Sequence, residues 1–377
     1  MLTYLDHAAT TPMRPEAIEA MMPYLDGVYA NPSGSHRFAR QARQAIDEAR
    51  DTVAEALGCK AGEVIFTSGG TEGDNSAVLG AVRKRGGVAV CSAAEHHAVL
   101  HCVEHLHGRV VHVNTLGSID LDSLSTTLAA ANNEDPIAVV SVMAVNNEVG
   151  TITPLTEVAK VVRKLAPNAL LHTDAVQAAC WFDLREVSKL VDVMTLSAHK
   201  FGGPKGMGIM MTHLGHELEP LILGGGQERD RRSGTHNVAG IIASATALRI
   251  TDVTRQAEVE RISKLRDRLV DDVCAAIPNV LETVPRENRV AGIAHLCIKG
   301  CESEAILYLL DEADVCASAA SACASGAMEP SHVLQAMGVD KEWSMGALRF
   351  SLGHTTTDLD IDRAIEALSE SVHKLRR

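Results

Sequence analysis

Short apolar runs alternate with longer amphipathic segments between about residues 60 and 215. The short runs have the length of buried strands, and the longer segments place apolar residues at helical spacing. We expect strands at 63–68, 88–92, 109–114, 136–143, 169–174, 192–200 and 208–213, and helices at 71–85, 96–106 and 154–166. Such alternation predicts an α/β fold with a mostly parallel central sheet that helices cover on both faces.

The pattern changes near residue 250. Residues 251–277 form one long, charged amphipathic segment, which predicts a helix that separates two layers. After it we expect a strand at 292–298, a helix at 303–313, a strand at 347–352 and a final helix at 358–377. This predicts two domains, a large one over 15–250 and a smaller α/β domain over 251–377 that residues 1–14 join.

The composition is that of an ordinary folded protein. Of the 377 residues, 46% are hydrophobic and 22% are charged, which excludes a disordered or fibrous chain. The net charge of -13 argues against nucleic-acid binding as the main role. No apolar run approaches the roughly 18 residues of a membrane span. The 9 cysteines lack short regular spacings and no signal-peptide pattern is present, so we expect a cytoplasmic protein with reduced thiols.

Three strand ends carry residues that suit a bound anion or a reacting group. The loop 68–72 (SGGTE) has two glycines and opens a helix, which predicts a phosphate site, although an ordinary strand-to-helix turn is the alternative. Asp174 could hold a protonated ring nitrogen or cap a helix. Lys200 could condense with a carbonyl or be a solvated loop residue. A phosphate site, a carboxylate and an amine in one sheet are the set that pyridoxal 5'-phosphate requires, so we expect this cofactor.

These residues belong to a series of motifs that runs over about residues 3 to 375. The motifs are YLDHAATTP (4–12), NPSGSH (31–36), FTSGGTEGDN (66–75), AEHHAVL (94–100), VNNEVGT (145–151), HTDAVQ (172–177), SAHKFGGPKG (197–206), GGGQERDRRSGTHNV (224–238), SACASG (321–326), EPSHVL (329–334) and LRFSLG (348–353). In this order and spacing the chain resembles cysteine desulfurases of the NifS/IscS type, in the class V aminotransferase family. The resemblance implies a pyridoxal-phosphate-dependent transferase of fold type I.

The resemblance also implies how the cofactor is held. Lys200 would bind its aldehyde, Asp174 would pair with the ring nitrogen, and Gln177 would contact the ring oxygen. His96 would stack over the ring and move protons. The implied phosphate ligands are Gly70, Thr71, Ser197 and His199.

Substrate and subunit contacts follow from the same resemblance. Asn147 would contact both cofactor and substrate, and Arg349 would hold the substrate carboxylate with its guanidinium group. Thr235 would reach the cofactor phosphate of a partner subunit, which implies a homodimer.

Cys323 is the implied nucleophile, because it lies among small residues that allow a reactive thiol to move. The resemblance implies that L-cysteine is converted to L-alanine and a Cys323 persulfide. The sulfur would pass to an acceptor protein, such as an iron–sulfur scaffold or a tRNA-thiolation protein. A role for Cys323 as a transient iron–sulfur cluster ligand is left open. The alternative activities are selenocysteine lyase and another class V aminotransferase or lyase.

Two patterns of cysteine or histidine could bind a metal, but we do not favour a metal site at either of them. Cys297 and Cys301 lack the second pair of a zinc site. His97, His101 and His105 recur at a spacing that could bind zinc, nickel or copper, but a solvated helix face is the preferred interpretation. The chain ends without the longer tail with which some relatives dock an iron–sulfur scaffold, so that partner is left open.

Overall fold

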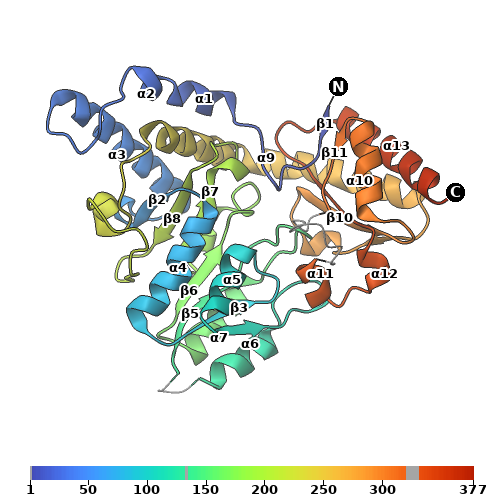
Figure 1. Ribbon diagram of the computed structural model, residues 1–377, viewed down its shortest axis with the longest axis horizontal. Helices are drawn as coiled ribbons and strands as arrows, with labels where there is room; N and C mark the ends of the chain where they lie inside the picture. Colours follow the sequence, from blue (N-terminus) through green and yellow to red (C-terminus); the bar gives the residue numbers. More distant parts are fainter. Residues whose placement is uncertain (1, 132–134, 320–330) are drawn as a thin grey trace.

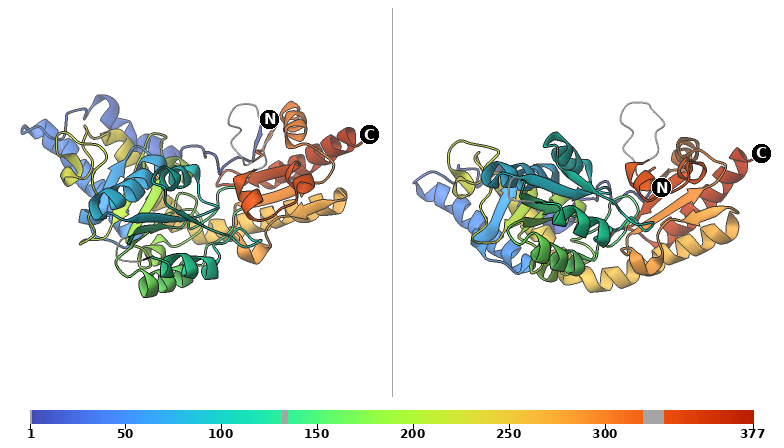
Figure 2. Two further views of the ribbon diagram at one scale, coloured as in Figure 1. Left: turned by 60° about the horizontal axis from the view of Figure 1, so that its bottom comes forward. Right: turned by 90° about the horizontal axis from the view of Figure 1, so that it is seen from below.

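The computed structural model describes residues 2–131, 135–319 and 331–377. A large and a small lobe lie side by side, and the 39-residue helix α9 (Val238–Ala276) runs along both of them (Figure 1, Figure 2). The first half of α9 contributes Ile241 and Leu248 to the core of the large lobe. Its second half contributes Ile262 and Val273 to the core of the small lobe. Since residue 250 lies inside this helix, the domain boundary near 250 stays a prediction.

The large lobe is built on a 7-stranded sheet with the strand order β2-β8-β7-β6-β5-β3-β4. Its strands are β2 (Val64–Thr67), β3 (Val88–Ser92), β4 (Arg109–Val111), β5 (Ile137–Ser141), β6 (Leu170–Asp174), β7 (Val193–Ser197) and β8 (Gly208–Thr212). Strand β8 runs antiparallel to both of its neighbours, and the other pairs are parallel. The predicted fold class is therefore confirmed.

Helices cover both faces of this sheet because successive strand residues point to opposite sides. Ile65 of β2 packs against α4 (Gly70–Arg85) and α5 (His97–His105). Its neighbours Val64 and Phe66 belong to the core on the other face. That core also receives α3 (Arg37–Leu57), α6 (Leu121–Ala129), α7 (Leu155–Leu165), α8 (Leu184–Ser188) and the first half of α9.

The small lobe has an antiparallel sheet in the order β12-β10-β9. Its strands are β9 (Val280–Glu282), β10 (Ile293–Ile298) and β12 (Ala347–Ser351), and helices α10 (Ser303–Glu312) and α13 (Asp358–Leu375) pack on it. The N-terminal strand β1 (Thr3–Tyr4) pairs in parallel with β11 (Val315–Cys316). The remaining short helices are α1 (Pro15–Met21), α2 (Pro23–Asp26), α11 (His332–Ala336) and α12 (Lys341–Ser344).

The two longest helices of the described residues differ from the sequence prediction. Helix α9 begins at Val238 rather than at 251, because residues 238–250 are apolar or small almost throughout and carry no polar stripe. Helix α3 was not predicted, since most of its buried positions are alanines, whose hydrophobic signal is weak. Among the described residues, no helix is both long and apolar enough to span a membrane.

Candidate active site

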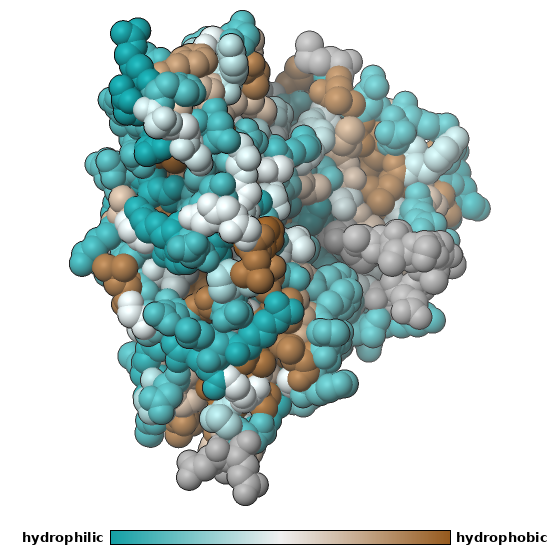
Figure 3. Space-filling model, turned by 60° about the vertical axis from the view of Figure 1, so that its left-hand side comes forward, coloured by the Kyte–Doolittle hydropathy of each residue, from teal (hydrophilic) through white to brown (hydrophobic). Residues whose placement is uncertain are grey.

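A cavity of about 400 Å³ opens where the carboxyl ends of the parallel strands meet the small lobe. The space-filling view shows a recess between the two lobes (Figure 3). The cavity brings together ten of the residues that the sequence predicts for the site: Gly70, Thr71, His96, Asn147, Asp174, Gln177, Ser197, His199, Lys200 and Arg349. Residues more than 270 positions apart in the chain therefore line one cavity.

The residues predicted to bind a phosphate lie around the start of α4. The N–H groups of a helix's first turn have no acceptor within the helix and favour an anion. A Cβ atom on Gly70 would lie 2.8 Å from Val176 Cγ2, so only glycine fits this wall without a shift. Nearby, burial and the charges of Lys200 and Lys205 lower the pKa of His199 to about 4. A neutral His199 can therefore donate one hydrogen bond to an anion.

The amine of Lys200 is held at the cavity wall. Its Nζ donates to the carbonyl oxygens of Ala8, at 2.5 Å, and of Ala9, at 2.9 Å. Burial, reinforced by the positive charge of Arg349, lowers the pKa of Lys200 to about 8. A fraction of this amine is neutral near pH 7, and the neutral form can attack a carbonyl or accept a proton.

Asp174 ends strand β6 and is buried. Its Oδ1 accepts a hydrogen bond from the Val176 N–H at 2.8 Å. Burial raises the pKa of Asp174 to about 6, although this hydrogen bond and the charge of Lys200 act in the opposite direction. A protonated ring nitrogen beside it would favour the ionised carboxylate. Gln177 donates from Nε2 to the Ala8 carbonyl at 2.8 Å, which fixes its amide at the same wall.

Two buried carboxyl groups near Asp174 were not predicted. Asp74 lines the cavity, and its Oδ1 has no hydrogen-bond partner among the described residues. Glu95 accepts from the Met143 N–H at 2.8 Å, while its Oε2 likewise has no partner in the described part of the chain. Burial, with the charge of Asp174 as a further cause, raises the pKa of both groups well above the usual range. The sequence did contain a signal for Asp74: it lies three residues after Thr71, so the two side chains share a helix face.

His96 lines the cavity and caps the start of α5. Its Nδ1 accepts a hydrogen bond from the Ala98 N–H at 3.1 Å, so the neutral ring carries its proton on Nε2. Burial, followed by the charge of Lys200, lowers the pKa of His96. A neutral imidazole with a defined Nε2–H can stack on a planar ring and move a proton.

Arg349 brings a positive charge from the small lobe to the cavity. Its Nη2 donates to Asp6 Oδ1 at 2.7 Å, and its Nη1 donates to the Asn147 carbonyl at 2.8 Å. Its buried Nε has no hydrogen-bond partner among the described residues. The backbone of Arg349 pairs with that of Ser318 through two hydrogen bonds of 2.7 and 3.1 Å. Since the guanidinium has five N–H donors and bonds two acceptors here, donors remain for an incoming carboxylate. Asp6, which the sequence prediction left without a role, orients the guanidinium.

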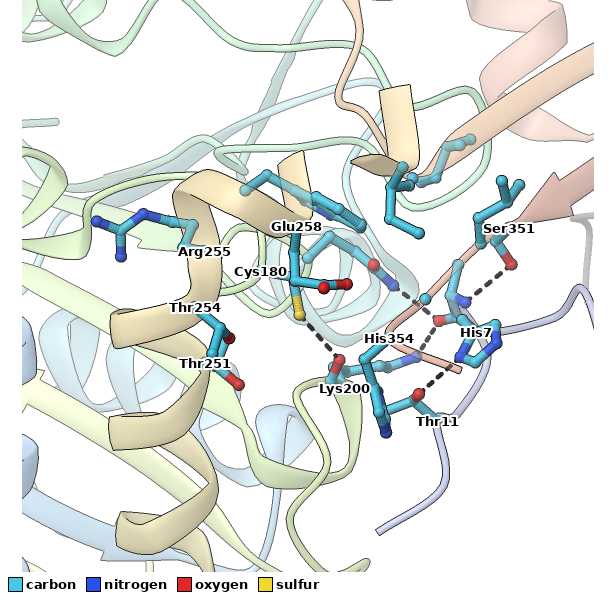
Figure 4. Close-up of a pocket in the computed structure, with 18 of the residues that line it drawn as sticks. His7, Thr11, Cys180, Lys200, Thr251, Thr254, Arg255, Glu258, Ser351 and His354 are labelled. Carbon is cyan, nitrogen blue, oxygen red and sulfur yellow. Dashed lines mark hydrogen bonds between the residues drawn. The ribbon is translucent and has the colours of Figure 1, made fainter. Parts of the chain in front are cut away.

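A second cavity shares Ala8, Gln177 and Lys200 with the first (Figure 4). On this side the Cys180 Sγ donates to the Lys200 carbonyl at 3.5 Å. Burial raises the pKa of Cys180 to about 11, so this thiol stays protonated. This contact fixes the backbone of Lys200 on the side of the second cavity.

Two of the predicted site residues are not among the described residues that line the cavity. Thr235 is exposed on the loop that precedes α9. Cys323 lies outside the described residues. The three histidines His97, His101 and His105 line a surface pocket on α5 that adjoins the cavity through Thr71 and His96. Over the described residues, no group of three or more His, Cys, Asp or Glu side chains is placed to hold a metal ion.

The cavity residues fit pyridoxal 5'-phosphate. The glycine-lined start of α4, with the Thr71 and Ser197 hydroxyl groups, suits its phosphate. Asp174 offers a buried carboxylate for the ring nitrogen, and Lys200 offers an amine for the aldehyde.

Comparisons with known proteins agree with this chemistry. The chain matches the family Aminotransferase class-V over residues 3–364. A cysteine desulfurase IscS from Dictyoglomus turgidum is 41% identical over 381 residues, which cover 99% of this chain and 95% of the relative. A solved NifS-like protein is 32% identical, with a TM-score of 0.91 over 99% of this chain and 100% of that one. The structure of SspA in complex with cysteine is 28% identical, with a TM-score of 0.80 over 93% and 98% of the two chains.

The match is continuous from the N-terminal strand to the last helix, so both lobes are included. It confirms the resemblance seen in the motifs and the fold-type-I architecture. The chain belongs to the class V aminotransferase family, whose members are enzymes that depend on pyridoxal 5'-phosphate.

Proposed function

We propose that the protein is a cysteine desulfurase, which transfers the sulfur of L-cysteine to Cys323. The backbone pairing of Ser318 with Arg349 carries this proposal. Cys323 follows Ser318 by five residues. Five residues span at most about 17 Å when extended. Cys323 is therefore close enough in the sequence for its thiol to reach a substrate that Arg349 would bind.

L-cysteine suits the charges of the cavity. Its carboxylate would accept from the guanidinium group of Arg349, and its amine would approach Lys200. Asn147 contacts Arg349 through its carbonyl and would line the substrate position. The cysteine bound to the related SspA supports this choice of substrate.

Two residues move protons in the proposed reaction. When bound, the cofactor withdraws electrons from the substrate and so weakens its Cα–H and Cβ–S bonds. Lys200 Nζ accepts the α-proton in its neutral form, which its lowered pKa makes available. His96 donates from Nε2, the nitrogen that its helix-capping contact leaves protonated. Asp174 stays ionised beside the ring nitrogen.

The sulfur step takes place between two thiols. The Cys323 thiolate attacks the substrate sulfur, an S–S bond forms and the Cβ–S bond breaks. The electron pair of the broken bond stays on carbon, which takes up a proton and becomes the methyl group of L-alanine. The net reaction is L-cysteine plus the Cys323 thiol giving L-alanine plus the Cys323 persulfide. An acceptor protein or a thiol reductant then removes the outer sulfur.

A homodimer would complete the phosphate site. The loop before α9 carries Thr235 and also exposes Ile222 and Leu223, which are 39% and 77% exposed. Exposed apolar side chains on the same loop as Thr235 suit burial against a second copy. The acceptor of the sulfur is proposed to be a protein of iron–sulfur cluster assembly or of tRNA thiolation.

The test is turnover of L-cysteine with dithiothreitol, in which alanine and sulfide are measured together. We expect equal amounts of both from the wild type and neither from Cys323→Ala. Cys274→Ala removes an exposed thiol away from the cavity and serves as the matched control. Pyruvate as the product, or undiminished sulfide release by Cys323→Ala, contradicts the proposal and favours a lyase or an aminotransferase.

A further inference from the structure

The turn over residues 68–72 joins β2 to α4 and carries two of the residues expected to bind the cofactor phosphate. Gly70 and Thr71 line the cavity, and Glu72 follows them in the first turn of α4. Glu72 is not one of the residues that line the cavity. Its side chain turns back to the start of the turn, where Oε2 accepts a hydrogen bond from the Ser68 N–H at 2.8 Å. Glu72 thus closes the turn around Gly70.

Arg232 holds this carboxylate from a distant part of the chain. Its Nε donates to Glu72 Oε1 at 2.8 Å, and its Nη2 donates to Glu72 Oε2 at 3.1 Å. A two-point contact between a guanidinium and a carboxylate fixes orientation as well as distance. Burial acts to raise the pKa of Glu72, but the bonds from Arg232 and Ser68 outweigh it and lower this pKa. Glu72 is therefore ionised and paired.

The ion pair also sets the charge at the start of α4. An ionised carboxylate in the first turn of a helix occupies the positive end of the helix dipole, which a phosphate would also use. Arg232 neutralises the Glu72 carboxylate, so the dipole remains available for a phosphate. Without Arg232, the unpaired carboxylate would repel a phosphate bound beside Gly70 and Thr71.

The loop that carries Arg232 is anchored on the large lobe. Buried Glu228 accepts from two nitrogens of Arg50 on α3, each at 2.7 Å, and from the Phe66 N–H of β2 at 3.1 Å. His236 Nε2 donates to Glu228 Oε1 at 2.8 Å. Figure 1 shows this part of the chain beside α3 and β2. The loop is thus held at Glu228 and His236, on both sides of Arg232.

Three successive residues of this loop adopt the left-handed conformation, although none of them is glycine. The φ angles of Glu228, Arg229 and Asp230 are 49°, 59° and 63°. Side chains make this conformation unfavourable, so it persists only where surrounding contacts fix the backbone, and it is found most often at functional sites. The buried contacts of Glu228 supply that support. Two residues further on, Arg232 reaches Glu72.

From these contacts we propose that Arg232 and Glu72 are positioning residues for the cofactor phosphate. Their ion pair holds the turn that carries Gly70 and Thr71 in its binding conformation and removes a competing negative charge. Neither Arg232 nor Glu72 lines the cavity, so both act through the turn. This inference rests on the predicted phosphate site and does not depend on the proposed sulfur transfer.

The test compares pyridoxal 5'-phosphate with pyridoxal, which has the same ring and aldehyde but no phosphate. Fluorescence titration of the cofactor-free protein measures both affinities without L-cysteine. A hydrogen bond to a charged group corresponds to about 10- to 100-fold in an equilibrium constant. We expect Arg232→Ala to weaken the binding of pyridoxal 5'-phosphate at least about tenfold and to leave the binding of pyridoxal unchanged. A general loss of structure would weaken both ligands alike.

A double variant tests the charge of Glu72. In Arg232→Ala/Glu72→Gln the competing charge is absent, while glutamine keeps an oxygen for the Ser68 N–H. We expect this variant to bind pyridoxal 5'-phosphate more tightly than Arg232→Ala does, but less tightly than the wild type. An affinity no better than that of Arg232→Ala would overturn the charge part of the proposal.

Arg163→Ala is the matched control. Arg163 donates to both oxygens of Asp192, at 2.8 and 2.7 Å, and Asp192 also accepts from the Leu171 N–H at 2.8 Å. This arrangement repeats that of Arg232 and Glu72, but it lies near the amino end of β6, and neither side chain lines the cavity. We expect Arg163→Ala to lose thermal stability and to keep both affinities. If Arg232→Ala fails to fold, Arg232→Lys replaces it, because lysine keeps the charge and loses the two-point contact.

Three results would overturn the positioning role. They are wild-type affinities in a folded Arg232 variant, an equal weakening of both ligands in that variant, and an equal loss of pyridoxal 5'-phosphate binding in Arg163→Ala. If the wild type binds pyridoxal as tightly as pyridoxal 5'-phosphate, the predicted phosphate site itself is wrong. A protein with the expected affinities that transfers no sulfur refutes only the proposed function, so these failures are distinguishable.

Discussion

The floor and the rim of the cavity are built on different principles. On the floor, Asp74 and Asp174 line the cavity, with Glu95 as a buried neighbour, and burial on the large lobe raises the pKa of all three. On the rim, Arg349 of the small lobe is oriented by Asp6 through an ion pair and by backbone pairing. The floor thus suits a fixed cofactor, whereas the rim suits a substrate that enters and leaves. Changes to the floor should alter cofactor binding, and changes to the rim should alter substrate binding.

Replacing Lys200, which lies between floor and rim, is expected to have the largest effect. Lys200→Ala removes both the amine that would bind the cofactor and the proposed base. Loss of a positioned base costs about 10²- to 10⁴-fold in rate, so we expect turnover to fall at least a thousandfold. Stopped-flow turnover and denaturing gel filtration, which tests covalent retention of the cofactor, check this. If Lys200→Ala still retained the cofactor covalently, Lys200 would not be the residue that binds it.

Arg349→Lys tests the rim alone. Lysine keeps the positive charge but lacks the planar group that bonds Asp6 and Asn147 together. We expect the KM for L-cysteine to rise about 10- to 100-fold, since a hydrogen bond to a charged group contributes about 1.5–3 kcal/mol. Cofactor content, measured by absorbance, should not change. A loss of cofactor with an unchanged KM would contradict the separation of rim and floor.

Asp174→Asn tests the floor through pH. Because burial raises the pKa of Asp174 to about 6, the folded cofactor-free protein holds this proton more tightly than the unfolded chain. Stability of the cofactor-free protein should therefore fall as pH rises from about 4 to above 6, with Asp174 contributing about 2 kcal/mol of the change. Urea unfolding at pH 4.5 and 7.0 measures this change. Asn cannot titrate, so an equally large change in the variant would assign the effect to Asp74 and Glu95 instead.

Gly70→Ala is expected to have the smallest effect, and it tests the proposed phosphate site. The added Cβ would meet Val176 Cγ2 at 2.8 Å, so the start of α4 must shift. Overpacking of this kind costs about 1–3 kcal/mol, and we expect cofactor affinity to fall about tenfold. Fluorescence titration of the cofactor-free protein measures it. Gly62→Ala, where nothing lies within 4 Å of an added Cβ, is the control and should leave affinity unchanged.

The sequence predicted the large sheet well because its strands are short, mostly apolar and largely separated by amphipathic helices. Strands β3 and β6, for example, lie within a residue of the expected 88–92 and 169–174. Helix α9 and helix α3 were harder to predict. In α9, the N-terminal half is buried against the large lobe and has no polar face, whereas α3 buries mainly alanine. Such segments lack the periodic contrast on which the prediction depends.

For the site, motifs predicted the residues but not their partners. Lys200, Asp174 and Arg349 were predicted from motifs, and the cavity contains them. The contacts of Asp6 with Arg349, and of Ser331 with Glu148, join residues 343 and 183 positions apart. No local pattern marks such pairs, because they arise only when distant parts of the chain fold together. Buried Asp74 was missed for a related reason, since a helix aspartate is usually solvated.

The central claim is that Cys323 receives the sulfur of the substrate. The most direct measurement is mass spectrometry of the peptide that contains Cys323, after one turnover with L-cysteine and without a reductant. The account predicts a mass gain of one sulfur atom on Cys323, in step with the L-alanine released, and no gain on the exposed Cys274. L-alanine released with an unmodified Cys323 peptide would contradict the account.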